Sequence, residues 1–238
     1  MDGRRRLSLL SCTLLFVWFG AATVALAGTI GFPVPRQEPL HLRFELVGDS
    51  FKEDLNNDTG DAEATTGRAL ATVALGLTSW LEIYGRVGLA EFNVNEALFS
   101  GGFGFAFGGG LRVRLWRFPF GQLGLAGQYL RFTSDDDDSA GIRIEGEWEE
   151  FDMALGIGTR RFGAFQFYGG GAYHETEITL DPETGPHRTL DTETPVRLFL
   201  GVHIYPLADF PRGEFVVAIE ARFIGETPQF TLGVQYQF

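Results

Sequence analysis

Hydrophobic and polar residues alternate without a break over the last ten residues of the chain, 229–238. The apolar positions are Phe230, Leu232, Val234, Tyr236 and Phe238. Alternation with a period of two places successive side chains on opposite faces of an extended chain, so it predicts a β-strand with one apolar face and one polar face. The chain then ends directly on an aromatic residue of the apolar face.

The same alternation recurs along most of the chain and predicts an all-β fold. Ten strands are expected at residues 40–49, 66–78, 81–92, 102–115, 120–133, 146–159, 164–178, 195–205, 214–224 and 229–238. The connections mostly alternate in length, with long loops at 50–64, 93–100, 134–144 and 179–193 and short turns at 79–80, 116–119, 160–163 and 206–213. Eight strands is the alternative, and Trp148 breaks the phase of its strand, which predicts a β-bulge there.

The first residues have the organisation of a secretory signal peptide. Arg4, Arg5 and Arg6 precede an apolar run over 7–26, and Ala25-Leu26-Ala27 before Gly28 is a small-x-small cleavage site. Residues 1–27 are therefore expected to be removed, and the alternative is an uncleaved anchor helix. Residues 28–39 hold three prolines and are expected to form a short periplasmic lead-in to a barrel domain over 40–238.

Charge and composition exclude one class of partner. The predicted signal contains three arginines and one aspartate, which leaves 16 basic and 30 acidic residues over 28–238. Nucleic acid is therefore not an expected partner, because binding to phosphates requires a positive surface. Cys12, the single cysteine, falls within the signal, so no disulfide is expected. The 32 glycines and 23 phenylalanines suit a closed barrel with aromatic girdles.

Together, the signal and the terminal strand resemble those of small bacterial outer-membrane β-barrel proteins. The resemblance implies a transmembrane antiparallel up-and-down barrel of about ten strands in the outer membrane, with long loops outside the cell and short turns in the periplasm. It also implies that Phe230, Leu232, Val234, Tyr236 and Phe238 form the signal that the barrel assembly machinery reads. The partners it implies are that machinery, periplasmic chaperones, outer-membrane lipid and lipopolysaccharide.

The polar faces of the expected strands would then point into the lumen. They carry His41, Arg43, Glu45, Arg68, Glu82, Tyr84, Arg86, Arg112, Arg114, Asp152, Arg197, His203, Glu220 and Arg222. In a barrel this narrow, side chains can fill the interior, and charges of opposite sign are expected to pair there. The main hypothesis is a polar network that fills the lumen of a structural or surface-interaction protein, and the alternative is a narrow channel for small solutes.

A second alternative is a hydrolase with a site at the outer rim. His174 and Glu175 are expected at the outer end of their strand and His187 in the loop beyond, with Ser134 or Ser139 as nucleophile. No catalytic motif supports this trio, so the prediction is a protein that is not an enzyme. The acidic run 135–138 and the spacing of Asp54, Asn56 and Asp58 match a calcium loop poorly, and no metal or cofactor is predicted.

Overall fold

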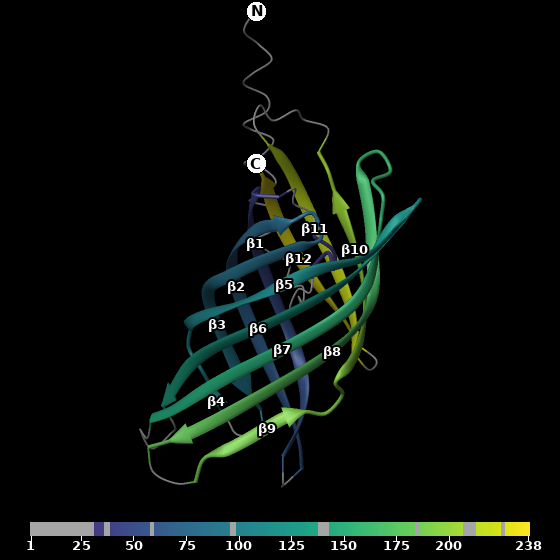
Figure 1. The fold of residues 1–238 in the computed structure, drawn as a ribbon. Coiled ribbons are helices and arrows are strands. Elements are labelled where there is room, and N and C mark those ends of the chain that lie inside the picture. Colours follow the sequence, from purple (N-terminus) through teal and green to yellow (C-terminus); the bar gives the residue numbers. More distant parts are fainter. Residues whose placement is uncertain are drawn as a thin grey trace, which may run out of the picture.

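The computed structural model shows an all-β chain in which antiparallel strands close into a ring (Figure 1). The structure describes residues 31–35, 39–57, 60–95, 99–137, 143–183, 186–206, 213–224 and 227–238. The predicted signal over 1–27 lies outside these residues. Within them, no helix is long and apolar enough to cross a membrane.

Ten strands of the described chain close the ring, which confirms the expected number. They are β1 (Leu42–Asn57), β2 (Gly60–Thr78), β3 (Leu81–Val94), β5 (Gly104–Phe118), β6 (Gly121–Asp137), β7 (Arg143–Thr159), β8 (Phe165–Pro182), β10 (Val196–Ile204), β11 (Glu214–Ile224) and β12 (Thr227–Gln237). Each pairs with its neighbours in this order, and β12 pairs back onto β1 from Asp49↔Thr231 to Arg43↔Gln237. Two short strands, β4 (Phe99–Ser100) and β9 (Arg188–Thr192), add to the ring at one end.

The two ends of the barrel differ. At one end, which we call the terminal end, the Leu40 amide donates to the Gly76 carbonyl and the Phe238 amide donates to the Leu42 carbonyl. The short turn at 79–80 lies at this end as well. The opposite, distal end carries β4, β9 and the extended β1–β2 hairpin (Figure 1). Both described chain ends therefore lie beside the short turns, as the up-and-down pattern requires.

The predicted loop over 50–64 is wrong, because the strands continue through it. The β1–β2 register runs without interruption from Leu42↔Leu75 to Asn57↔Gly60. Polar residues at the outward positions made the segment resemble a loop, but backbone pairing depends on hydrogen bonds and not on side-chain polarity. The loops expected over 93–100, 134–144 and 179–193 likewise lose residues to β4, to β6 and β7, and to β9.

The bulge predicted at Trp148 is also absent from its strand. Trp148 pairs with Phe132 on one side and Ile178 on the other, in a register that runs through all of β7. The side chain points into the lumen in phase with Glu150 and Asp152, and it is fully buried. The phase appeared broken because the lumen is apolar at this level, so an inward position carries a large aromatic residue.

Strand β9 gives the ring a second closure at the distal end. It pairs with β8 over 188–191 and also with β1, where Leu55 faces Thr192 and Asn56 faces Asp191. Strand β10 also pairs with β8 but has β11 as its other neighbour. The β11–β12 hairpin therefore ends on the terminal side of β9. The wall formed by β10, β11 and β12 is shorter than the wall formed by β1, β2 and β5 to β8.

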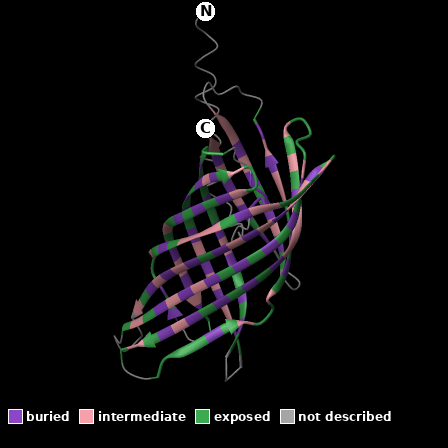
Figure 2. Ribbon diagram, viewed as in Figure 1, coloured by how far each residue is buried: buried purple, intermediate pink, exposed green. Residues whose placement is uncertain are grey.

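The outer surface of the ring is apolar over most of its height. Burial alternates residue by residue along the strands, and outward positions are exposed or half-buried (Figure 2). Large exposed side chains on β7 include Phe151, Met153, Leu155 and Ile157, and their neighbours on the other strands are similar. Towards the distal end the outward positions become charged, as at Glu145, Glu147 and Glu149. An exposed apolar belt of this extent needs an apolar solvent around it.

Candidate functional site

The lumen of the barrel is filled in three layers along its axis. A cluster of apolar side chains fills the distal end, a charged layer fills the middle, and the chain segment over 31–35 fills the terminal end. We call these the distal cluster, the charged layer and the N-terminal segment. The first two are built from inward positions, which lie two residues apart along each strand. The third is a stretch of chain that belongs to no strand.

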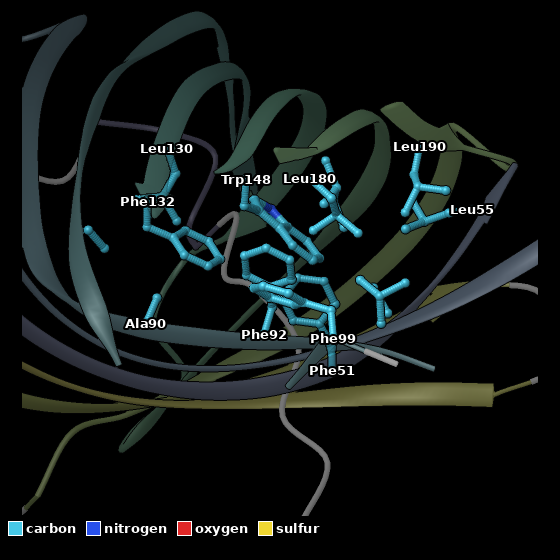
Figure 3. Packing of buried hydrophobic residues seen from close by; sticks show 14 of the residues in the cluster. Phe51, Leu55, Ala90, Phe92, Phe99, Leu130, Phe132, Trp148, Leu180 and Leu190 are labelled. Atoms are coloured by element: carbon cyan, nitrogen blue, oxygen red, sulfur yellow. The ribbon is translucent and has the colours of Figure 1, made fainter. Parts of the chain in front are cut away.

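The distal cluster is a hydrophobic core inside the ring (Figure 3). The Trp148 ring stacks on Phe132 with centroids 5.5 Å apart, and Phe92 and Phe51 meet it edge-on at 5.6 and 6.0 Å. Such aromatic pairs add to the free energy gained by burial of apolar area. Leu55, Leu70, Phe99, Leu130, Ile178, Leu180 and Leu190 complete the larger side chains of the cluster. Large side chains from β1 to β4 and from β6 to β9 therefore close the lumen at this level.

Arg68 connects two walls of the barrel just below the distal cluster. Its Nε donates to Asp49 Oδ1 on the adjacent strand β1 at 2.7 Å, and its Nη1 donates to Glu150 Oε2 on β7 at 2.6 Å. Four positions in the ring separate β2 from β7, so the second bond crosses the lumen. All three side chains are buried, and each charge is compensated by a partner of opposite sign, as a buried charge requires.

Two more arginines extend this layer from the other side of the ring. Arg197 on β10 donates to Glu53 on β1 across the intervening β11–β12 hairpin. Arg222 on β11 donates to Glu220 at 3.3 Å, and its Nη1 lies 3.9 Å from Asp152 Oδ1. Neither Arg222 Nη1 nor Nη2 has a hydrogen-bond partner within the described part of the chain. The middle of the lumen is therefore polar and has donor atoms to spare.

His174 lies inside this layer, which contradicts its expected place at the rim. One ring nitrogen, Nδ1, lies 2.7 Å from Asp152 Oδ1, and the other, Nε2, lies 2.8 Å from Thr176 Oγ1. The chain of hydroxyl, imidazole and carboxylate has the order of a catalytic triad. All three residues are buried beneath the distal cluster, however, so a substrate cannot reach the hydroxyl. The arrangement is that of a structural hydrogen-bond network.

The same region contains three groups with the donor atoms of a metal site. Single donor atoms of Glu150, Asp152 and His174 lie within 4.8 Å of one another. The guanidinium of Arg68 already neutralises Glu150, and the Gln128 amide donates to Asp152 Oδ2 at 2.6 Å. The Arg68 guanidinium lies 2.6 Å from Glu150 Oε2, so it would repel a metal ion bound to that carboxylate. The cluster is therefore better explained by ion pairing than by a metal.

A second group of charges lies nearer the terminal end. Glu82 Oε1 accepts from Arg43 Nη2 at 2.7 Å and from Arg112 Nη1 at 2.6 Å. The guanidinium of Arg112 also lies over the Tyr84 ring, 4.4 Å from its centroid, where a cation–π interaction holds it. Arg86 Nη1 donates to Gln128 Oε1 at 2.7 Å and so joins this group to the first. These bonds link β1, β3, β5 and β6.

The N-terminal segment enters the lumen at the terminal end. All of its residues, 31–35, are buried, with Phe32 at 1% and Val34 at 0% exposure. The Gly31 amide donates to Glu220 Oε2 at 2.9 Å. The Phe32 ring lies against Tyr168 and His203, with centroids 5.4 and 5.3 Å away. The lead-in expected over 28–39 therefore includes a stretch that lies within the barrel.

The structure brings most of the predicted lumen residues together. Twelve of the fourteen are buried: Arg43, Glu45, Arg68, Glu82, Tyr84, Arg86, Arg112, Asp152, Arg197, His203, Glu220 and Arg222. His41 is exposed, because it precedes β1, and Arg114 is half-buried beside the bulge at the end of β5. Asp49, Glu53, Glu150, Gln128 and His174 were missed as lumen residues. Asp49, Gln128, Glu150 and His174 lie at inward positions of expected strands, so the alternation within those strands already indicated them. Only Glu53 lies in a supposed loop, and continuing the alternation of the first strand would have found it.

The residues of the expected assembly signal share the outer face of β12. Phe230 and Phe238 are exposed, and Leu232, Val234 and Tyr236 are half-buried. The Phe238 ring meets Tyr236 edge-on at 4.8 Å and Phe44 of β1 at 5.8 Å. These contacts lie where the last strand joins the first. Recognition of this strand by an assembly machinery stays a prediction.

A closed ring with an apolar outer belt and a polar layer inside defines the class of protein, a transmembrane β-barrel of the outer-membrane type. No family model matches the chain, and no curated protein sequence matches it.

Several solved structures overlay on this chain at low sequence identity. The translocator domain of autotransporter NalP from Neisseria meningitidis is 11% identical, with a TM-score of 0.48 over 98% of this chain and 95% of that chain. The outer membrane protease OmpT from Escherichia coli is 11% identical, with a TM-score of 0.42 over 88% and 96%. Outer membrane protein AlkL, solved in lipid bilayers, is 14% identical, with a TM-score of 0.42 over 91% and 96%. The second and third are named as outer-membrane proteins, and the class of this chain rests on its own ring and surface.

Proposed function

We propose that this chain is an integral barrel of the bacterial outer membrane that has a structural or surface-interaction role and does not conduct in its resting form. The observation that carries the proposal is the filled lumen. Side chains from facing walls meet in the distal cluster, Arg68 crosses the lumen to Glu150, and the N-terminal segment fills the terminal end. A continuous water path would have to pass all three.

The orientation follows from the two ends of the barrel. Short turns and both termini lie on the periplasmic side of outer-membrane barrels, so the terminal end is assigned to the periplasm and the distal hairpins to the cell exterior. The outward faces of β7 and β8 are acidic at the distal end, where Glu149 is paired across the strands with Glu177. Divalent ions that bridge these carboxylates to lipopolysaccharide phosphates would relieve this repulsion.

Biogenesis follows the resemblance of the signal and the last strand. Export through a cleaved N-terminal signal, escort by periplasmic chaperones and insertion by the barrel assembly machinery are the route proposed for this chain. The apolar outer belt supports this route, because the chain must be kept from aggregating until it reaches the lipid.

Conductance of the purified full chain in planar bilayers tests the proposal. We expect no single-channel steps above the baseline of protein-free bilayers. Discrete steps that require the protein would overturn the resting seal and favour the narrow channel. The observation in favour of that second function is the spare donor capacity of Arg222 in the charged layer. Steps that shrink or change ion preference with Arg222→Gln would assign the constriction to this residue.

A further inference from the structure

The N-terminal segment occupies a recess that the barrel wall forms for it. Inward positions on β6 and β7 beside the segment are small, and they include Gly124, Gly156 and Gly158. A Cβ atom at Gly158 would lie 2.2 Å from Phe32 Cζ, and one at Gly124 would lie 2.5 Å from the Pro33 carbonyl oxygen. The wall and the segment therefore fit each other, and larger side chains in the wall would leave no room.

The segment is also held by specific contacts rather than by shape alone. Its amide at Gly31 is bonded to Glu220, and the same carboxylate oxygen accepts from the Tyr168 hydroxyl at 3.0 Å. Phe32 packs against the rings of Tyr168 and His203, which also contact each other with centroids 5.0 Å apart. Val34 joins a small apolar cluster with Ala126, Ala154, Ala172 and Phe199. Glu220 thus connects the segment directly to Arg222 of the charged layer.

Nothing in the described wall depends on the segment for its pairing. The ten strands close the ring among themselves, and residues 31–35 belong to no strand. Pro33 and Pro35 carry no amide N–H, so this stretch can be buried without strand partners and can leave without breaking a ladder. With cleavage after Ala27, three residues precede Gly31, so withdrawal would not require threading of a long chain.

We propose that residues 31–35 act as a removable plug of the periplasmic half of the lumen. The plug closes the barrel in the resting protein. Its release opens a vestibule that extends from the periplasm to the charged layer, while the distal cluster keeps the outer end shut. The vestibule admits water and small ions to Glu220 and Arg222. The periplasmic direction rests on the proposed function, whereas the plug and its release do not.

Accessibility of a single cysteine tests the plug in the full chain in detergent. Ala218, which lies two positions from Glu220 on the inward face of β11, is buried at 5% exposure and serves as the reporter as Ala218→Cys in a Cys12→Ser background. Two substitutions are designed to displace the plug, one in the barrel wall and one in the plug itself. Gly158→Leu fills the space of the Phe32 ring, and Phe32→Asp places a carboxylate near Glu220.

Reaction of the reporter with a small charged thiol reagent is then followed over time. We expect the reporter cysteine to react roughly tenfold faster or more in both variants than in the parent, because a buried thiol reacts only when the structure around it opens. The matched control is Gly127→Leu, at an outward position of β6 where a Cβ meets nothing closer than 3.9 Å. It should react at the parental rate.

Two results would overturn the plug. If the reporter reacts equally fast in all proteins, residues 31–35 do not close the lumen. If both plug variants lose the compact band that a folded barrel gives on an unheated denaturing gel, the segment is part of the fold and is not removable. Because the measurement is made in detergent, its outcome is independent of bilayer conductance, and failure of the plug is distinguishable from failure of the resting seal.

Discussion

The guanidinium of Arg68 on β2 donates to the carboxylate of Glu150 on β7 across the lumen, with 2.6 Å between Nη1 and Oε2. The bond joins strands four positions apart in the ring, and both side chains are 2% exposed. The ion pair therefore links two opposite parts of the wall and obstructs the lumen between them.

Loss of Arg68 should destabilise the barrel strongly. Arg68→Ala leaves Asp49 and Glu150 buried without their cation, which typically costs about 3–5 kcal/mol. The measurement is denaturant unfolding of the detergent-solubilised protein. The control is Arg131→Ala, which removes an exposed ion pair with Glu147 and should change the midpoint little. Equal shifts of the unfolding midpoint in the two variants would show that the ion pair across the lumen stabilises the barrel no more than a surface pair does.

Trp148 should be shielded from lipid, unlike the tryptophans of the outer surface. Trp148 is fully buried in the distal cluster, whereas Trp80 and Trp116 are 51% and 68% exposed on the terminal end of the wall. Brominated lipids quench indoles that they touch. In a membrane, quenching should therefore persist when Trp148→Phe removes the inner indole and disappear when Trp80→Phe and Trp116→Phe are combined. Quenching of the remaining Trp148 would contradict its place inside the ring.

Substitution of His174 should affect stability rather than any hydrolytic activity. His174→Ala removes a hydrogen-bond partner of buried Asp152, which leaves a carboxylate oxygen undersatisfied at a cost of about 1–3 kcal/mol. His187→Ala, at an exposed position, should leave the unfolding midpoint unchanged. A lipid or peptide cleavage activity that is lost with His174→Ala in a folded barrel would restore the hydrolase hypothesis.

Deletion of Phe238 should reduce assembly more than the loss of its local contact does. If the last strand is read by the assembly machinery, the deletion lowers the amount of heat-modifiable barrel in the outer membrane. Phe44→Ala removes one ring that packs on Phe238 but keeps the terminal residue. This control should assemble close to the parental level. A similar loss in both variants would mean that the contact between β1 and β12 matters, and not the recognition of a terminal aromatic residue.

The alternation of apolar and polar residues was sufficient to predict ten strands, and the resemblance of the signal and the last strand to those of outer-membrane proteins added the closed barrel. The prediction succeeded because side-chain direction in a strand has a period of two, and this relation depends on the local chain alone. The same local relation identified most of the lumen residues, from Arg43 to Arg222. It failed where the polarity of an environment changed along one strand. Between the apolar belt and the distal end the outward positions are polar, as at Lys52. In the lumen near the distal end the inward positions are apolar, as at Trp148.

The tertiary structure alone decided which inward residues meet. Arg68 and Glu150 are 82 residues apart in the sequence, and Gly31 and Glu220 are 189 apart. Their contacts depend on the number of strands, their register and the closure of β12 onto β1, none of which a local pattern specifies. The plug is the clearest case. Residues 31–35 read as a proline-rich lead-in, and the recess that holds them exists only once β6 and β7 lie side by side with glycines facing inward.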